Sequence, residues 1–174
     1  VTHANIVYNA HYIQESFRLH RESVSVSWLP AFHDMGLIDG VIGPVYTGYL
    51  GVLMSPVSFI QRPARWLENI TRFRATHCGG PNFGYDLCVQ KIAPEARAAL
   101  DLSSWESAYN GAEPVRAHTL RAFTAAFASC GFRATAHYPC FGMAETTLMV
   151  SGCDIRREPV VRRVDRVALE RGIF

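Results

Sequence analysis

Residues 105–138 read WESAYNGAEPVRAHTLRAFTAAFASCGFRATAHY, and this stretch decides the fold class. It opens with Trp105–Tyr109, a short run of the kind that forms a buried strand. Residues 115–129 follow with apolar side chains three and four positions apart, which is typical of a helix, and Gly131 is placed to end it. Residues 134–138 predict a second strand. A strand, a helix and a strand in this order predict a parallel β-α-β unit.

The same alternation of strands and helices extends toward the N-terminus. Thr2 is expected to cap a first helix, whose apolar positions recur at helical spacing as far as Phe17. Further strands are predicted at 23–29, 51–55 and 75–78, and further helices at 35–46, 63–73, 82–92 and 94–100. The sequence therefore predicts an α/β fold of layered, largely parallel sheets flanked by helices, forming one domain or part of one.

Composition and charge exclude several classes of function. The 174 residues carry 17 Lys and Arg against 15 Asp and Glu, so no basic face for nucleic acid or an anionic membrane is indicated. Apolar residues make up 49% of the chain, enough for a core, yet no apolar run reaches the roughly 18 residues of a membrane span. Five cysteines without a Cys-x-x-Cys pair indicate reduced, buried thiols in a cytoplasmic protein.

In parallel α/β sheets the chemistry is concentrated at one edge. Ligands bind outside the carboxyl ends of the strands, in the loops that lead into helices. Three such loops carry unusual residues here, at 32–37, 110–114 and 138–147. The sequence contains no Gly-x-Ser-x-Gly motif and no order of residues that indicates a hydrolase triad.

The third loop reads YPCFGMAETT and follows a predicted strand. We expect a turn at its proline, cysteine and glycine, and then a short helix near Ala144. Glu145 is flanked by hydroxyl side chains, a pattern that suits Mg²⁺ on the carboxylate and phosphate oxygens on the hydroxyl and backbone N–H groups. The alternative is an ordinary glutamate near a helix start, where the helix dipole favours a carboxylate.

The second loop, NGAEP at 110–114, also follows a predicted strand. Its small residues allow a flat ring such as adenine to approach the backbone closely. A hairpin-like turn that ends the strand, with Glu113 in solvent, explains the same residues.

Two further segments admit both a functional and a structural interpretation. Asp34 is suited to cap a helix, while His33 is either a structural histidine or a polar group at the mouth of a substrate pocket. The segment GGPNFGY at 79–85 combines glycines with aromatic rings. Such a segment can form the wall of an apolar tunnel, or it can be a strand-to-helix turn capped by Asn82.

Taken in order, these segments resemble one known superfamily. The strings are WLP at 28–30, HDMGL at 33–37, LMSP at 53–56, GGPNF at 79–83, YDLC at 85–88, DLSSW at 101–105, NGAEPV at 110–115 and YPCFGMAETT at 138–147. Together they resemble the adenylate-forming enzymes, and within them the fatty acyl-AMP ligases. The strings GGPNF and NGAEP favour this branch over the acyl-CoA ligases.

The resemblance implies a role for each matching residue. Asn110, Gly111, Ala112, Glu113 and Pro114 would form the adenine-binding loop, and Tyr138, Gly142, Met143, Ala144 and Thr146 would bind the adenylate and phosphates. Glu145 would be the Mg²⁺ ligand and a catalytic residue, together with His33. Asp34, Gly79, Gly80, Phe83 and Tyr85 would contact the acyl substrate. Met143 stands where leucine is usual in the family.

The implied reaction is the attack of a fatty carboxylate on ATP, which gives an acyl adenylate. The acyl group would then pass to the phosphopantetheine of an acyl carrier protein. Residues 1–174 would be part of the large N-terminal AMP-binding domain, with the phosphate loop upstream and the C-terminal domain downstream, and would be inactive alone. An acyl-CoA ligase, a non-catalytic nucleotide- or acyl-binding module and a purely structural α/β protein remain as alternatives.

Overall fold

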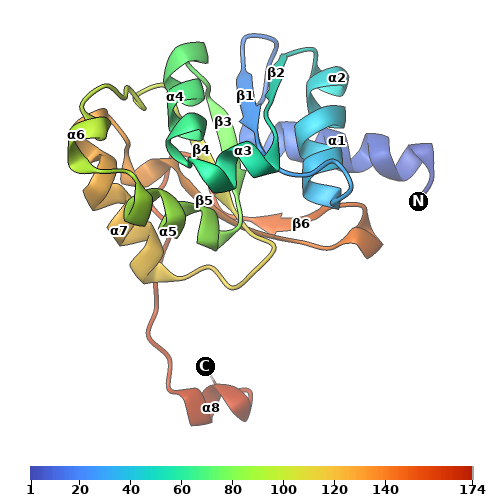
Figure 1. The fold of residues 1–174 in the computed structure, drawn as a ribbon. Coiled ribbons are helices and arrows are strands. Elements are labelled where there is room, and N and C mark those ends of the chain that lie inside the picture. The colour runs from blue at the N-terminus through green and yellow to red at the C-terminus, as the bar shows by residue number, and fades with distance from the viewer. Residues whose placement is uncertain (174) are drawn as a thin grey trace.

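A six-stranded sheet forms the centre of the computed structural model, which describes residues 1–173. The first five strands along the chain run parallel and the last is antiparallel to its neighbour. In spatial order the strands are β2 (Leu50–Leu53), β1 (Val24–Ser27), β3 (His77–Gly80), β4 (Ser107–Asn110), β5 (His137–Gly142) and β6 (Met149–Gly152). The predicted α/β class with a largely parallel sheet is therefore confirmed (Figure 1).

Helices cover both faces of the sheet, as Figure 1 shows. On one face lie α1 (His3–Phe17), the π-helix Met35–Ile42 and α2 (Gly43–Thr47); on the other lie α3 (Pro56–Gln61), α4 (Ala64–Phe73), α5 (Asn82–Lys91) and α7 (Ala117–Phe127). The short helices α6 (Pro94–Arg97) and α8 (Arg166–Glu170) complete the chain. No helix within residues 1–173 has both the length and the apolar character needed to cross a membrane.

The first helix begins at Thr2, as predicted. The Thr2 hydroxyl accepts a hydrogen bond from the Asn5 N–H at 3.3 Å, and the Asn5 side chain accepts one from the Thr2 N–H at 2.8 Å. Farther along α1, the buried Asn9 side chain donates to the Met149 carbonyl at 2.9 Å and accepts from the Met149 N–H at 3.0 Å. These two bonds attach β6 to α1.

An aromatic core fills the space between the sheet and the helices α4, α5 and α7. The Trp66 ring lies edge-on to Trp105 at 5.2 Å between centroids, and Tyr85 lies edge-on to Phe123 at 5.0 Å. The Tyr85 hydroxyl donates to the Tyr109 carbonyl at 2.7 Å, so this buried polar atom is satisfied. The four rings are almost fully buried.

Several predicted boundaries were wrong. The strand predicted at 105–109 is Ser107–Asn110, and the strand predicted at 134–138 begins only at His137, because residues 134–136 form a 3₁₀ turn. The strand then continues through Pro139, where we expected a turn. Proline is tolerated there because β5 pairs with β6 only from Cys140 onward.

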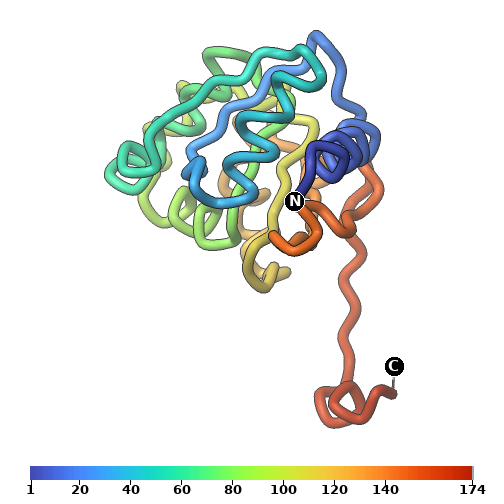
Figure 2. Tube along the Cα trace, turned by 90° about the vertical axis from the view of Figure 1, so that its right-hand side faces the viewer, coloured from blue at the N-terminus to red at the C-terminus, as the bar shows by residue number. Residues whose placement is uncertain are grey.

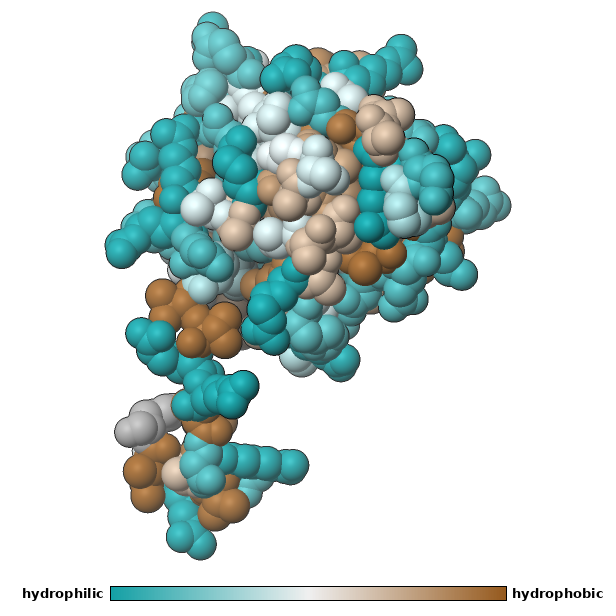
Figure 3. All heavy atoms as spheres, turned by 90° about the vertical axis from the view of Figure 1, so that its left-hand side faces the viewer, coloured by the Kyte–Doolittle hydropathy of each residue, from teal (hydrophilic) through white to brown (hydrophobic). Residues whose placement is uncertain are grey.

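Three elements were not predicted from the sequence, α3, β6 and α8, and neither was the wider helical geometry at 35–42. After β6 the chain runs as an extended segment to α8, away from the body (Figure 2). Figure 3 shows apolar side chains among the polar ones on this segment, and they include the exposed Val160, Val164 and Val167.

Candidate functional site

A cavity of about 170 Å³ lies beside the carboxyl ends of β4 and β5. Residues from all three predicted loops line it, namely His33, Asp34, Gly111, Ala112 and Gly142. The remaining walls come from α1, the π-helix, β4 and the β5–β6 connection and strands: Ile13, Phe17, Met35, Asp39, Tyr109, Cys140, Phe141, Leu148 and Met149. The sheet thus brings together residues that are far apart in the sequence.

His33 and Asp34 stand where the π-helix begins. The Asp34 carboxylate accepts a hydrogen bond from the Met35 N–H at 2.6 Å, which confirms its predicted role as a helix cap. Nδ1 of His33 lies 2.7 Å from the same carboxylate, and the His33 side chain is 49% exposed. The capping aspartate therefore orients a half-exposed imidazole toward the cavity, with Nε2 available to a ligand.

The loop after β4 is not a hairpin turn. β4 and β5 run parallel and are joined through α7, which removes the hairpin alternative for residues 110–114. Ala112 has a backbone φ of 65°, in the left-handed region that a non-glycine residue rarely adopts. The Glu113 carboxylate accepts a hydrogen bond from the Phe83 N–H at 2.7 Å, so the loop is attached to the first turn of α5.

Buried amide side chains support this loop from below. The Asn82 side-chain oxygen accepts from the Arg116 N–H at 3.0 Å and from the Asn110 side chain at 3.4 Å, and its amide donates to Thr119 at 3.0 Å. Asn110 is fully buried, and its side-chain oxygen has no hydrogen-bond partner within residues 1–173. Asn82 was predicted as a cap, but its side chain instead holds the loop after β4.

The segment at 138–147 forms the end of β5 and a tight connection to β6. A Cβ atom on Gly142 would lie 2.3 Å from the Leu148 carbonyl oxygen, so only glycine fits where the two strands meet. Beyond it, Glu145 lies exposed on a 3₁₀ turn, Ala144–Thr146. The expected short helix is therefore one turn, and a dipole of a longer helix does not explain the carboxylate.

Not every predicted site residue lines the cavity. Tyr138 is buried against the Phe17 ring at 4.2 Å, and burial is the main cause that raises its pKa above the usual value. Other predicted site residues are sequence neighbours of the cavity-lining residues but do not line the cavity themselves: Asn110, Glu113, Pro114, Met143, Ala144, Glu145 and Thr146.

The glycine-aromatic segment lies elsewhere. Gly79 and Gly80 are the last two residues of β3 rather than a loop, and a Cβ on Gly79 would lie 2.2 Å from the Tyr109 carbonyl oxygen. Tyr85 is fully buried in the aromatic core, and Phe83 alone of the four is exposed. The prediction of a loop at Gly79 and Gly80 was wrong because the strand extends beyond the apolar residues that predicted it. Gly79, Gly80, Phe83 and Tyr85 do not line the cavity.

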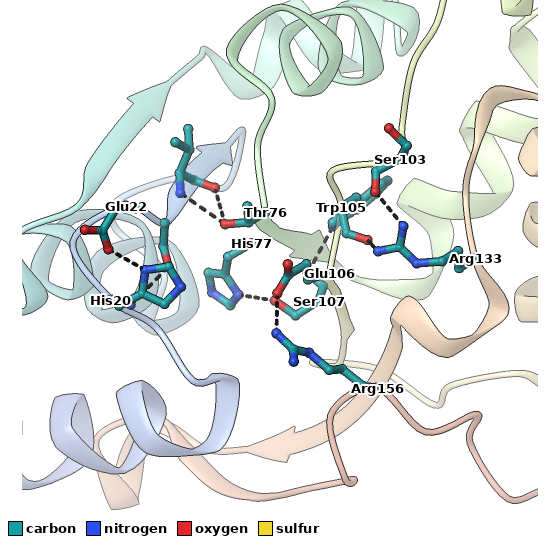
Figure 4. A network of polar contacts seen from close by, with 12 residues as sticks. His20, Glu22, Thr76, His77, Ser103, Trp105, Glu106, Ser107, Arg133 and Arg156 are labelled. Atoms are coloured by element: carbon teal, nitrogen blue, oxygen red, sulfur yellow. Dashed lines mark hydrogen bonds and ion pairs between the residues drawn. The ribbon is translucent and has the colours of Figure 1, made fainter.

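Three hydrogen-bonded polar side chains that we did not predict lie beside the cavity. Asp39, which lines the cavity, lies 2.9 Å from His77, and His77 lies 2.7 Å from Ser107. Figure 4 shows His77 and Ser107 facing one another across β3 and β4. Burial and, next, the charge of Asp39 raise the pKa of the neighbouring Tyr109 hydroxyl.

The donor set for a metal is small. Among the described residues no group of three or more His, Cys, Asp and Glu side chains is placed to hold a metal ion. Magnesium is commonly bound through one or two carboxylates together with substrate phosphates, whereas all-protein cages are the exception. A single exposed carboxylate such as Glu145 fits a magnesium ion that arrives with a nucleotide.

Comparisons with known proteins agree with this geometry. The sequence profile described as "AMP-binding enzyme" matches residues 1–169. The chain is 46% identical over 99% of its length to the medium-chain-fatty-acid–[acyl-carrier-protein] ligase TtuA of Teredinibacter turnerae, of which it covers 27%. It is 49% identical over 87% of its length to the ligase JamA of Moorena producens, of the same description, and covers 26% of it.

A solved structure matches equally well. The fatty acyl-adenylate ligase from L. pneumophila, in complex with acyl adenylate and pyrophosphate, superposes with a TM-score of 0.90 at 48% identity, over 91% of this chain and 28% of that one. The chain thus spans about a quarter of the length of the relatives it matches. Because the family profile covers nearly all of it, the chain belongs to the family of AMP-binding enzymes.

Proposed function

We propose that this chain contributes the acyl- and adenine-binding part of an enzyme that activates a fatty acid with ATP. The products are an acyl adenylate and pyrophosphate, and the acyl group then passes to the phosphopantetheine of an acyl carrier protein. The observation that carries the proposal is the meeting of His33, Gly111, Ala112 and Gly142 in one cavity at the carboxyl edge of the sheet. A 48% identical structure described as a complex with acyl adenylate and pyrophosphate supports it.

The nucleotide lies along the loop after β4 and the end of β5. Residues 110–114 hold the adenine, since Gly111 and Ala112 expose backbone at the cavity and Glu113 fixes the loop to α5. Tyr138 supports the adenylate segment, and Ala144 and Glu145 supply backbone N–H groups to the phosphate oxygens. The Thr146 hydroxyl, which donates to the Met143 carbonyl at 3.0 Å, would turn to reach them.

Glu145 would hold Mg²⁺, which would supply neutralisation of the charge on the ATP phosphates. As the imidazolium, His33 donates from Nδ1 to Asp34 and from Nε2 to the substrate carboxylate or the α-phosphate, so Asp34 keeps the ring in that orientation. Neither His33 nor Asp34 forms a covalent bond to the substrate.

The acyl group occupies the apolar part of the cavity. Its walls there are Ile13, Phe17, Met35, Leu148 and Met149. The two similar ligases are named for medium-chain fatty acids and for an acyl carrier protein. This supports a fatty acid as the substrate and a carrier protein as the acceptor.

The test is pyrophosphate release by the full-length protein with ATP, Mg²⁺ and octanoic acid. We expect release that requires the acid, and a loss of about 100-fold or more in His33→Ala and in Glu145→Ala. Glu22→Ala, which removes an exposed carboxylate paired only with His20, is the matched control and should keep full activity. Transfer of the acyl group to coenzyme A in preference to a phosphopantetheinylated carrier protein would identify an acyl-CoA ligase instead.

A further inference from the structure

A buried carboxylate forms part of the wall of the cavity. Asp39 is 5% exposed and lines the cavity from the π-helix. Its Oδ1 lies 2.9 Å from Nε2 of His77. Nδ1 of the same ring lies 2.7 Å from the Ser107 hydroxyl, as Figure 4 shows. The three side chains form a continuous polar chain that runs from the cavity into the sheet.

The three hydrogen-bonded side chains hold the Asp39 carboxylate in one orientation. The His77 ring packs against Phe17, with 4.6 Å between centroids, and against Tyr109 at 5.0 Å. Because Asp39 is an acceptor, Nε2 of His77 carries the hydrogen, and in the neutral ring Nδ1 accepts from Ser107. Ser107 is buried in β4 and does not line the cavity, so the three residues are not arranged for nucleophilic attack.

The carboxylate retains hydrogen-bonding capacity toward the cavity. A carboxylate offers about four acceptor sites. His77 takes one of them at 2.9 Å, and the Tyr109 hydroxyl lies near the same carboxylate. A fatty acid whose acyl chain ends in a methyl group would place hydrocarbon against the charge of Asp39. It would supply no hydrogen-bond donor to the carboxylate, which is unfavourable. A hydroxyl at the same place would donate a hydrogen bond.

The dimensions favour a short acid. Asp39 lies five residues beyond Asp34, which is about one turn of the π-helix. The cavity of about 170 Å³ is close in size to an apolar cavity of roughly 150 Å³ that holds one benzene ring. A carboxylate bound near His33 and Asp34 would thus place the far end of a short acid near Asp39.

We propose that Asp39, positioned by His77, selects carboxylic acids that carry a hydroxyl group at their far end over plain fatty acids of the same length. This inference rests on the proposed function, since it requires the cavity to be the acyl pocket. Sites that bond a substrate hydroxyl discriminate strongly against the analogue that lacks it, because the polar group of the site is then left without a partner.

The experiment compares matched pairs of acids in the full-length protein. Pyrophosphate release is measured with hexanoic and 6-hydroxyhexanoic acid, and with octanoic and 8-hydroxyoctanoic acid. We expect kcat/KM to favour the hydroxy acid by about tenfold or more in one of the pairs. Asp39→Leu should reverse the preference, and the nearly isosteric Asp39→Asn, which is less prone to misfold, should reduce it.

Three further variants separate a role in substrate selection from a role in folding. Asp154→Leu changes an exposed aspartate outside the cavity and should leave the ratio of the two acids unchanged. His77→Gln keeps a donor toward Asp39 and should retain more of the preference than His77→Leu. A preference that is the same in wild type, Asp39→Asn and Asp39→Leu, accompanied by lower stability, would mean that the pair only attaches the π-helix to the sheet.

Failure of the proposed selection and failure of the proposed function give different results. Equal kcat/KM for both acids of every pair in the wild type would overturn the selection and leave the proposed function standing. No pyrophosphate release with any acid would overturn the proposed function, and the selection with it.

Discussion

The carboxylate of Glu113 accepts a hydrogen bond from the backbone N–H of Phe83 at 2.7 Å, which joins the loop after β4 to the start of α5. The bond satisfies one of the free N–H groups of the helix end and places a negative charge where the helix dipole favours it. The loop that we assign to adenine is therefore held by its own acidic residue.

Glu113→Ala should loosen this loop. We expect a rise of several-fold in the KM for ATP in the full-length protein, with a loss of about 1 kcal/mol in stability because one exposed charge-assisted bond is removed. Steady-state pyrophosphate release and urea unfolding measure the two effects. Glu106→Ala, whose carboxylate pairs with Arg156 on the surface, serves as control, and an equal rise in KM there would contradict the assignment.

Gly142→Ala should disrupt the junction of β5 and β6. The added Cβ would collide with the Leu148 carbonyl, whose position is fixed by the bond from the Met143 N–H at 2.8 Å. We expect a destabilisation of about 1–3 kcal/mol, as for other overpacked sites, together with loss of adenylate formation. Ser151→Ala on β6 is the control and should leave the free energy of unfolding nearly unchanged. A Gly142→Ala variant as stable as the wild type would show that the junction can relax to accept the extra Cβ.

The buried His137 should make stability depend on pH. Burial lowers the pKa of His137 to about 4, and its Nε2 donates to the Leu120 carbonyl at 3.0 Å. The unfolded chain takes up a proton near the ordinary value of about 6.5, so this contribution to stability is complete above that pH. It is lost as the pH falls from about 6.5 toward 4.

Urea unfolding at pH 7 and pH 5 checks this effect. We expect a decrease on the order of 1–2 kcal/mol at pH 5. His137→Phe should flatten the pH dependence, whereas the exposed His3→Gln should not change it. A wild-type stability that is independent of pH over this range would refute the explanation.

Asn9 should be needed for the attachment of β6 to α1. Asn9→Ala removes both bonds to Met149 and leaves a buried N–H and carbonyl without partners. We expect a loss of about 2–4 kcal/mol and faster hydrogen exchange of residues 149–152, measured by mass spectrometry. Gln90→Ala on the exposed side of α5 is the control, and unchanged exchange in Asn9→Ala would exclude the attachment.

The sequence predicted the features that depend on residues close to one another in the chain. The β-α-β stretch at 105–138, the helix capped by Thr2 and the left-handed Gly131 all follow from spacing and turn chemistry, and the structure contains each of them. These features are local, because the same few residues decide them in any fold. The convergence of the three loops followed from the rule for parallel sheets.

What the sequence could not predict depends on tertiary contacts. Asp39, His77 and Ser107 are separated by 38 and 30 residues, and only the registered sheet brings them together. The glycines at 79 and 80 read as a turn, yet the Tyr109 and Trp28 side chains that pack over them require glycine inside a strand. β6 was missed because a bulged antiparallel edge strand carries little apolar periodicity.

The π-helix Met35–Ile42 carries one more consequence, which concerns how such a site can change. Asp34 stands at its beginning and Asp39 within it, and each residue of this wider helix turns the backbone by less than the roughly 100° of an α-helix. Deletion of one residue between them would rotate Asp39 away from His77 and bring another side chain to the cavity. A change in the length of this segment can therefore replace the residue that meets the acid without substituting any residue of the chain.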